Sequence, residues 1–136
     1  MAYRILSLDG GGIRGIITII LMERLLERQP DWLERVDLFA GTSTGGILSL
    51  GLASGLKPRE LKQLYMDRGH EIFADSLWDD VKDPGRLAGV EYSSENLKRI
   101  LHEVFDGRTL GDLKQRVVVP VFDLGNEAET VESRSW

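Results

Sequence analysis

Hydrophobic and polar residues follow one another along this chain in blocks that predict strands and helices in alternation. Short apolar runs at 3–8, 36–40 and 117–122 are rich in β-prone residues, and each predicts a strand. Longer stretches with apolar residues at helical spacing predict the helices that separate them. These predicted helices span 13–29, 47–55, 58–73 and 93–105. Strands and helices in alternation predict an α/β fold.

The first predicted helix is apolar over most of its length, and we therefore expect it to be buried, with a charged last turn. Its apolar residues at helical spacings are Ile17, Ile20, Leu21, Met22 and Leu25. The run at 117–122 is continuously apolar, which suits a strand of a parallel sheet covered on both faces. Both features indicate a layered α/β domain.

Local signals predict the ends of the later helices. Pro58 stands where a helix accepts proline, in its first turn. Ser93 or Ser94 is a candidate N-cap for the last predicted helix, and Asp106-Gly107 predicts its end. Residues 74–92 lack periodicity, and we expect a loop there.

Composition and charge restrict the class of protein. A chain of 136 residues with 42% hydrophobic and 29% charged residues fits one globular domain. A net charge of −5 argues against a nucleic-acid partner, and attraction to anionic lipid would need a local basic patch. The chain has no cysteine, which excludes disulfides and thiolate nucleophiles. The apolar run at 16–22 is too short to span a membrane. We expect a cytoplasmic protein with peripheral membrane association.

The sequence Gly41-Thr42-Ser43-Thr44-Gly45 is a G-x-S-x-G motif between a predicted strand and a predicted helix. In a nucleophile elbow the serine sits on a sharp strand-to-helix turn in a strained backbone conformation. Glycines two positions on either side avoid collisions with the neighbouring strand and helix. This context predicts that Ser43 is a nucleophile and that Gly41 and Gly45 allow the turn.

A second glycine motif, Gly10-Gly11-Gly12, follows the first predicted strand. Its backbone can direct several N–H groups into one small volume, as an oxyanion hole requires. The loops after neighbouring parallel strands open at the same sheet edge, which would bring this loop to Ser43. Arg14 adds a positive charge there. We expect Asp9 to brace the loop, through backbone N–H groups or by pairing with Arg14.

The same glycines match the dinucleotide-binding pattern G-x-G-x-x-G at Gly10, Gly12 and Gly15. That fold requires an acidic residue at the end of the second strand, to hold the ribose. Here the second predicted strand runs into Gly41-Thr42-Ser43, and Asp37 lies near its start. A phosphate-binding P-loop would also need a Gly-Lys-Ser/Thr sequence. The glycines therefore favour acyl transfer over nucleotide binding.

The pair of motifs resembles the patatin-like phospholipase family. The segments DGGGIRG and GTSTGG have that family's order and spacing, and VVVPVFDL is similar to its later core strand. The resemblance covers the whole chain. It implies a three-layer α/β/α sandwich with a parallel-centred sheet, which we expect to be incomplete here. Residues 1–136 would then form one domain, the N-terminal portion of a longer catalytic domain.

The resemblance also implies an activity, that of a lipid acyl hydrolase (a phospholipase A-type esterase) with a Ser-Asp dyad. By position Ser43 is the nucleophile, and the oxyanion hole comprises Gly10, Gly11, Gly12, Arg14 and Thr44. The implied substrate is a glycerolipid or phospholipid at a membrane or micelle surface. No cofactor and no metal ion are implied.

The aspartate of the dyad is the departure from the family pattern. It belongs to an Asp-Gly-Gly or Asp-Gly-Ala motif well after the elbow, whereas Asp106-Gly107 precedes the last predicted strand and reads as a helix end. Asp123 follows that strand and stays a candidate. His70 and His102 lie on polar helix flanks, where we expect solvated side chains. We therefore expect the aspartate to lie beyond this chain.

Two hypotheses follow from the missing base. In the first, the protein is a serine lipid hydrolase whose active form is longer, so that these 136 residues alone are inactive. In the second, the chain is a binding or regulatory module that holds an anion or a lipid headgroup at the glycine loop. The acidic segment at 75–83 lacks the spacing of a calcium-binding EF-hand loop, and we expect it to be solvated.

Overall fold

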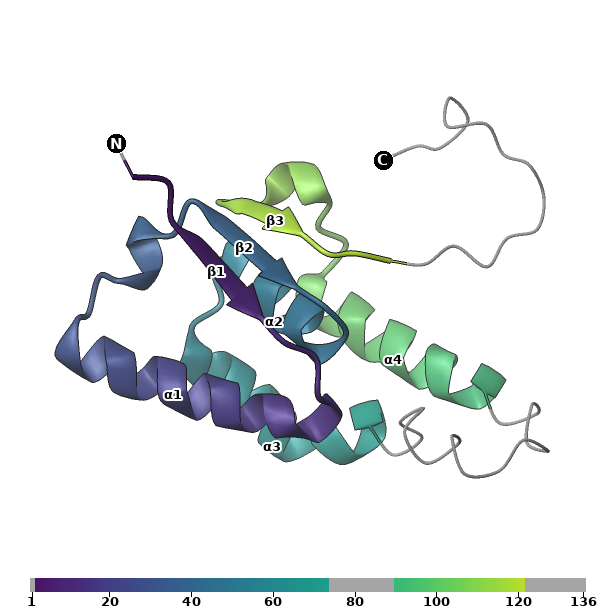
Figure 1. Ribbon diagram of the computed structural model, residues 1–136. Helices are drawn as coiled ribbons and strands as arrows, with labels where there is room; N and C mark the ends of the chain where they lie inside the picture. Colours follow the sequence, from purple (N-terminus) through teal and green to yellow (C-terminus); the bar gives the residue numbers. More distant parts are fainter. Residues whose placement is uncertain (1, 74–89, 122–136) are drawn as a thin grey trace.

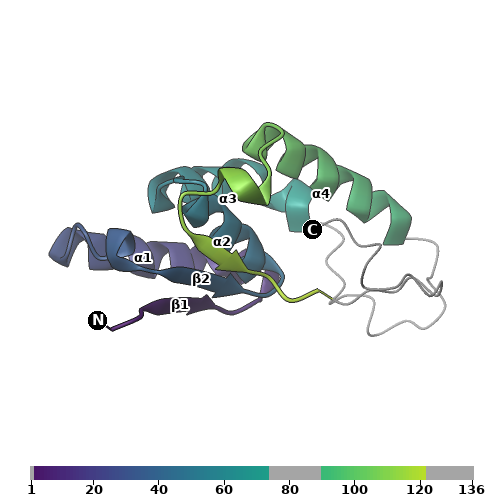
Figure 2. The ribbon, with the colours of Figure 1, turned by 90° about the horizontal axis from the view of Figure 1, so that it is seen from above.

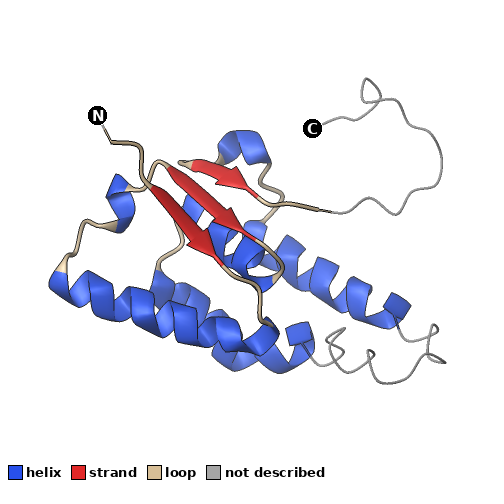
Figure 3. Ribbon diagram, viewed as in Figure 1, coloured by secondary structure: helices blue, strands red, loops and turns tan. Residues whose placement is uncertain are grey.

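The computed structural model describes residues 2–73 and 90–121, the second range with side chains from Leu97 onward (Figure 1). Its centre is a parallel sheet with strand order β1-β2-β3 (Figure 3). The strands are β1 (Ile5–Leu8), β2 (Leu38–Gly41) and β3 (Arg116–Val118). The register places Leu8 beside Gly41, so that β1 and β2 end at the same edge. The predicted α/β fold with a parallel sheet is confirmed.

Four α-helices accompany the sheet in the described ranges. They are α1 (Gly15–Arg28), α2 (Thr44–Ala53), α3 (Pro58–Phe73) and α4 (Val90–Phe105). Helix α2 lies across one face of the sheet and contacts all three strands, with α3 and α4 on the same side (Figure 2). Helix α1 packs beside α3. None of these described helices combines the length and the apolar composition of a membrane span.

The core lies between the sheet and α2. Phe39 of β2 and Leu48 of α2 are at most 1% exposed, and both belong to the same buried cluster. Side chains alternate between the two faces of each strand. Ile5 and Val118 therefore point to the opposite face, where they are 59% and 53% exposed. The described helices thus cover one face of the sheet.

The prediction that the first helix is buried was wrong for much of its surface. Ile19 and Met22 lie in the core, whereas four other apolar residues of α1 are exposed. These are Ile17, Ile20, Leu21 and Leu25. A helix that is apolar on all sides does not show by its pattern which side packs. Here α1 packs mainly through the side that faces α3 and α2.

The helix ends follow the local signals in part. Helix α3 spans Pro58–Phe73, as predicted. Asp106 and Gly107 adopt left-handed φ angles of 48° and 69° after α4, and so end that helix as predicted. Helix α4 begins at Val90, earlier than the predicted cap at Ser93 or Ser94, since valine, glutamate and tyrosine at 90–92 all tolerate a helix. The predicted acidic loop at 75–83 lies outside the described residues.

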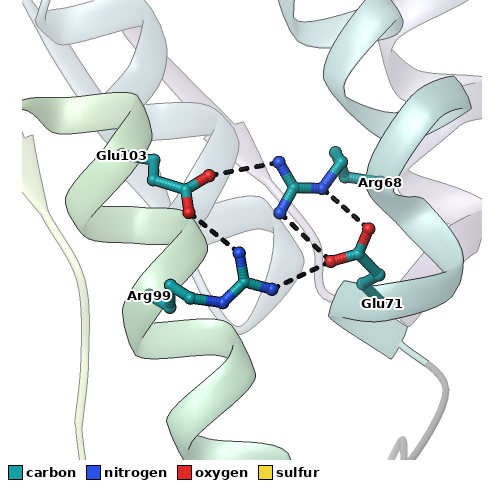
Figure 4. Close-up of polar contacts among 4 residues, drawn as sticks. All are labelled: Arg68, Glu71, Arg99 and Glu103. Atoms are coloured by element: carbon teal, nitrogen blue, oxygen red, sulfur yellow. Dashed lines mark hydrogen bonds and ion pairs between the residues drawn. The ribbon is translucent and has the colours of Figure 1, made fainter.

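A closed ring of four charged side chains joins α3 to α4 (Figure 4). Arg68 bonds Glu71 at 2.9 Å and Glu103 at 3.1 Å. Arg99 completes the ring with distances of 3.0 Å to Glu71 and 2.8 Å to Glu103. Hydrogen bonds lower the pKa of the carboxyl groups of Glu71 and Glu103 below its ordinary value, and those from Arg68 have a larger effect than those from Arg99. The ring is exposed, so we expect its ion pairs to make only a small contribution to the free energy of unfolding.

The contribution of the ring to the free energy of unfolding is expected to decrease at low pH. Because the folded-state pKa of Glu103 is lowered, its contribution to the free energy of unfolding is complete above the ordinary carboxyl pKa of 4.5 and disappears as the pH falls through the lower folded value. Urea denaturation should show that Glu103→Gln destabilises the protein less at pH 3 than at pH 7. Glu27→Gln, at an exposed position of α1, is the control. An equal cost of Glu103→Gln at both pH values would contradict this expectation.

Candidate active site

Ser43 lies on the sharp turn between β2 and α2, at the carboxyl edge of the sheet. Its side chain is exposed, and its backbone angles are φ 51° and ψ −124°. Among the described non-glycine residues, only Ser43 and Asp106 have positive φ. A residue held in such a conformation stores about 1–3 kcal/mol of strain, and such strain is concentrated at functional sites. We call residues 41–45 the elbow, because a strained residue between a strand and a helix is what a nucleophile elbow requires.

The two glycines of the motif lie where no side chain fits. A Cβ built on Gly45 would lie 2.1 Å from the carbonyl oxygen of Leu8. A Cβ on Gly41 would lie 2.2 Å from the carbonyl oxygen of Gly45 and 2.7 Å from the hydroxyl of Ser49. The backbone of the turn is therefore pressed directly against the end of β1.

The glycine loop after β1 lies beside Ser43. A Cβ on Gly10 would be 3.1 Å from the Cβ of Ser43 and 3.0 Å from the carbonyl oxygen of Thr42. Gly12 has a left-handed φ of 57° at the start of a short 3-10 helix, η1 (Gly12–Arg14), which leads into α1. The structure thus brings together the two segments that the sequence placed at one edge, a serine and a row of glycine amides.

The charged residues of the loop differ from expectation. The Nε of Arg14 donates to the carbonyl oxygen of Gly11 at 3.3 Å, and the Arg14 side chain is otherwise exposed. The predicted brace by Asp9 was wrong, because in the described part of the chain its carboxylate has no hydrogen bond and no ion pair. The 3-10 turn of the backbone, with the N–H of Arg14 donating to Gly11, orders the loop instead.

Below the elbow lies a residue that the sequence reasoning missed. Tyr65 of α3 is 2% exposed, and its hydroxyl is hydrogen-bonded to the hydroxyl of Thr44, the first residue of α2. Burial raises the pKa of Tyr65 to about 12, so the phenol stays protonated at neutral pH. The available signal was a tyrosine on the buried side of a helix, where its hydroxyl needs a partner.

The other predicted candidates lie away from Ser43 or outside the described residues. His70 and His102 are exposed on α3 and α4, as expected. Asp106 follows α4. Two residues later, Arg108 donates a hydrogen bond to the carbonyl oxygen of Ser54, which follows the last residue of α2. Ser43 precedes the first residue of α2, and the helix between them is about 15 Å long. Asp123 is not among the described residues. In the described part of the chain, no side chain hydrogen-bonds the hydroxyl of Ser43.

Comparison with known proteins decides the family. The family model for patatin-like phospholipase matches residues 6–135 of the chain. The chain belongs to the patatin-like phospholipase family. This patatin-like chain is 42% identical over 126 residues to a cGAMP-activated phospholipase of Pseudomonas aeruginosa, covering 87% of the chain and 35% of that protein.

Two further relatives show the range of the family. A cGAMP-activated phospholipase of Vibrio cholerae is 39% identical over 135 residues, covering 89% of the chain and 38% of the relative. Patatin-like protein 2 of rice, Oryza sativa, is 33% identical over 147 aligned residues, covering 96% of the chain and 36% of the relative. The patatin-like chain therefore spans somewhat more than a third of the length of these relatives. No solved structure matches it.

Proposed function

We propose that this patatin-like protein is a serine lipid acyl hydrolase of the phospholipase A type, with Ser43 as its nucleophile. The observation that carries the proposal is the contact between the two loops, in which an exposed serine with a φ of 51° lies beside Gly10. Membership of a family of phospholipases supports lipid as the substrate class. The reactive carbonyl would lie over Ser43, facing the glycine loop.

In the proposed reaction, the Oγ of Ser43 attacks the ester carbonyl carbon while a base removes its proton. The carbonyl oxygen becomes an oxyanion, which the amides of Gly10, Gly11 and Gly12 and the N–H of Thr44 would bind. Loss of one such donor raises a barrier by about 3–4 kcal/mol in a serine hydrolase. The tetrahedral intermediate then expels the lipid alkoxide, which takes up the proton. Water hydrolyses the acyl-serine by the same steps and releases a fatty acid.

The base is proposed to be an aspartate, as the Ser-Asp dyad of the family implies. An exposed carboxyl group has a pKa near 4 and is a weak base at neutral pH. Such an aspartate would therefore act through a short charge-assisted hydrogen bond to Ser43, or in a site of low dielectric constant. We do not propose Asp106 for this role, because it ends α4 and its neighbour Arg108 contacts Ser54, at the end of α2 away from Ser43.

The substrate is proposed to be a phospholipid or another glycerolipid presented at a membrane or micelle surface. Two of the relatives described above are named as cGAMP-activated phospholipases, so an assay of this protein should be run with and without that nucleotide. The assay incubates the full-length protein with phosphatidylcholine and phosphatidylglycerol vesicles. Mass spectrometry then measures free fatty acid and lysophospholipid.

A fluorophosphonate probe gives an independent test of the nucleophile. We expect the probe to form a phosphonylated serine that peptide mapping locates at Ser43, because the elbow exposes this hydroxyl beside the amide donors. Fatty acid release together with labelling at Ser43 would support the proposal. The absence of both fatty acid release and labelling at Ser43, in assays with and without cGAMP, would refute the proposal.

A second candidate function is a binding or regulatory module on the same fold. It is favoured by one observation, that no side chain of the described residues bonds Ser43. In that case the glycine loop would hold an anion or a lipid headgroup, and Arg14 would contribute charge. Binding of glycerophosphate without any hydrolysis or probe labelling would favour this alternative.

A further inference from the structure

Three segments of the chain meet directly beneath the candidate active site. Gly15 begins α1 immediately after η1, Thr44 begins α2 immediately after Ser43, and Tyr65 lies on α3. A Cβ on Gly15 would lie 2.7 Å from the Thr44 hydroxyl and 3.0 Å from the Tyr65 ring. The loop that carries the amides and the turn that carries the serine thus rest on the same tyrosine.

We propose that Tyr65 is a positioning residue for the reaction proposed above, because its hydroxyl holds Thr44, and with it the Thr44 N–H, in place against the glycine loop. The inference rests on the proposed function, since it names the group that keeps the oxyanion site assembled. Tyr65 itself does not touch the reacting atoms.

The strain at Ser43 explains why the elbow needs this support. A φ of 51° is unfavourable for serine, so the neighbouring residues must be fixed from outside or the turn would relax. On one side Gly45 is pressed against Leu8 of β1. On the other side the fixed point is the hydrogen bond between Thr44 and Tyr65. The elbow is held between β1 and α3.

The surroundings of Tyr65 suit a rigid support. Its side chain is buried, and its ring packs against Phe73 with 5.4 Å between the ring centroids. The tyrosine hydroxyl also lies 3.5 Å from the carbonyl oxygen of Thr44, so both contacts of this hydroxyl go to the same residue. A phenylalanine would fill the same volume, which means that the hydroxyl itself can be tested with little change of packing.

The test compares three variants in the full-length protein. Tyr65→Phe and Thr44→Val each remove one partner of the hydrogen bond, and Thr44→Ser retains a hydroxyl. A shift of a catalytic group by about 1 Å can slow a reaction 100-fold. We therefore expect Tyr65→Phe and Thr44→Val each to lower kcat for vesicle hydrolysis by about 10- to 100-fold with KM changed less than about twofold. Thr44→Ser should recover most of the rate lost in Thr44→Val.

Two further measurements separate positioning from general stability. The double variant Tyr65→Phe/Thr44→Val should be no slower than the slower single variant, because both changes remove the same bond. Ile72→Val, a buried change elsewhere on α3, should lower Tm without lowering kcat. The pH profile of Tyr65→Phe should keep the wild-type shape, since a positioning group transfers no proton.

The outcomes distinguish this inference from the proposed function. Wild-type kcat in Tyr65→Phe with a lowered Tm would show a merely structural tyrosine and overturn the inference. If the wild type shows no hydrolysis that depends on Ser43, the proposed function fails. The role of Tyr65 is then tested by nitrogen-15 relaxation dispersion at the Ser43 and Thr44 amides. Conformational exchange at these amides that is present in Tyr65→Phe and absent in the wild type would support the role of Tyr65 in holding Thr44, and unchanged amides would overturn it.

Discussion

Replacing Ser43 with alanine is expected to abolish hydrolysis of phospholipid vesicles and of p-nitrophenyl esters by the full-length protein. Loss of the nucleophile removes the acyl-enzyme route, and in serine hydrolases this lowers kcat by far more than about 1000-fold. The same variant should lose fluorophosphonate labelling. Its thermal unfolding should stay close to that of the wild type, because the exposed hydroxyl has no hydrogen bond in the described part of the chain.

The control for this experiment is Ser7→Ala, which removes an exposed serine from β1. We expect the control to keep the wild-type rate, because residue 7 lies on a strand and not on the elbow. Hydrolysis that survives Ser43→Ala at more than about one hundredth of the wild-type rate would mean that another nucleophile or a bound water carries the reaction.

The second large effect is expected for Gly45→Ala. The added Cβ would lie 2.1 Å from the carbonyl oxygen of Leu8, and this contact is between two backbone segments, which cannot rotate away as a side chain would. Overpacking of this kind lowers the free energy of unfolding by about 3 kcal/mol or more. Urea denaturation followed by circular dichroism should show this loss, together with loss of probe labelling at Ser43.

Gly111→Ala, in the short 3-10 helix Leu110–Asp112, is the matched control for Gly45→Ala. Its Cβ would meet no atom closer than 3.6 Å, and its φ is not in the left-handed region. We expect it to change the free energy of unfolding by less than about 1 kcal/mol. Equal stability of the two variants would contradict the tight packing of the elbow against β1.

Much of the fold follows from local patterns. The strand and helix alternation, the start of α3 at Pro58 and the end of α4 at Asp106-Gly107 were all predictable. These features depend on properties of short segments, such as the fixed φ of proline and the free φ of glycine. The candidate site was predictable for a related reason. Each glycine motif follows a strand, and the loops that follow neighbouring parallel strands lie at the same edge of the sheet.

Other features depend on contacts between residues that lie far apart in the sequence, and local sequence patterns do not predict such contacts. Which side of α1 packs was one such feature, because its apolar residues surround the helix. The contacts of Asp9 and Arg14 were another, since neither of the two expected roles of Asp9 is seen and Arg14 donates to the backbone carbonyl of Gly11. The ion-pair ring between α3 and α4 joins residues 68 and 103, which only the packing of the two helices brings together.

By itself, the sequence determined the α/β class, the family and the order of the two glycine motifs, because each is encoded in consecutive residues. Only the tertiary structure decided that the hydroxyl of Tyr65, on another helix, is hydrogen-bonded to Thr44. The reason is physical. A hydrogen bond or a close contact depends on positions in space, and Thr44 and Tyr65 are 21 positions apart in the sequence.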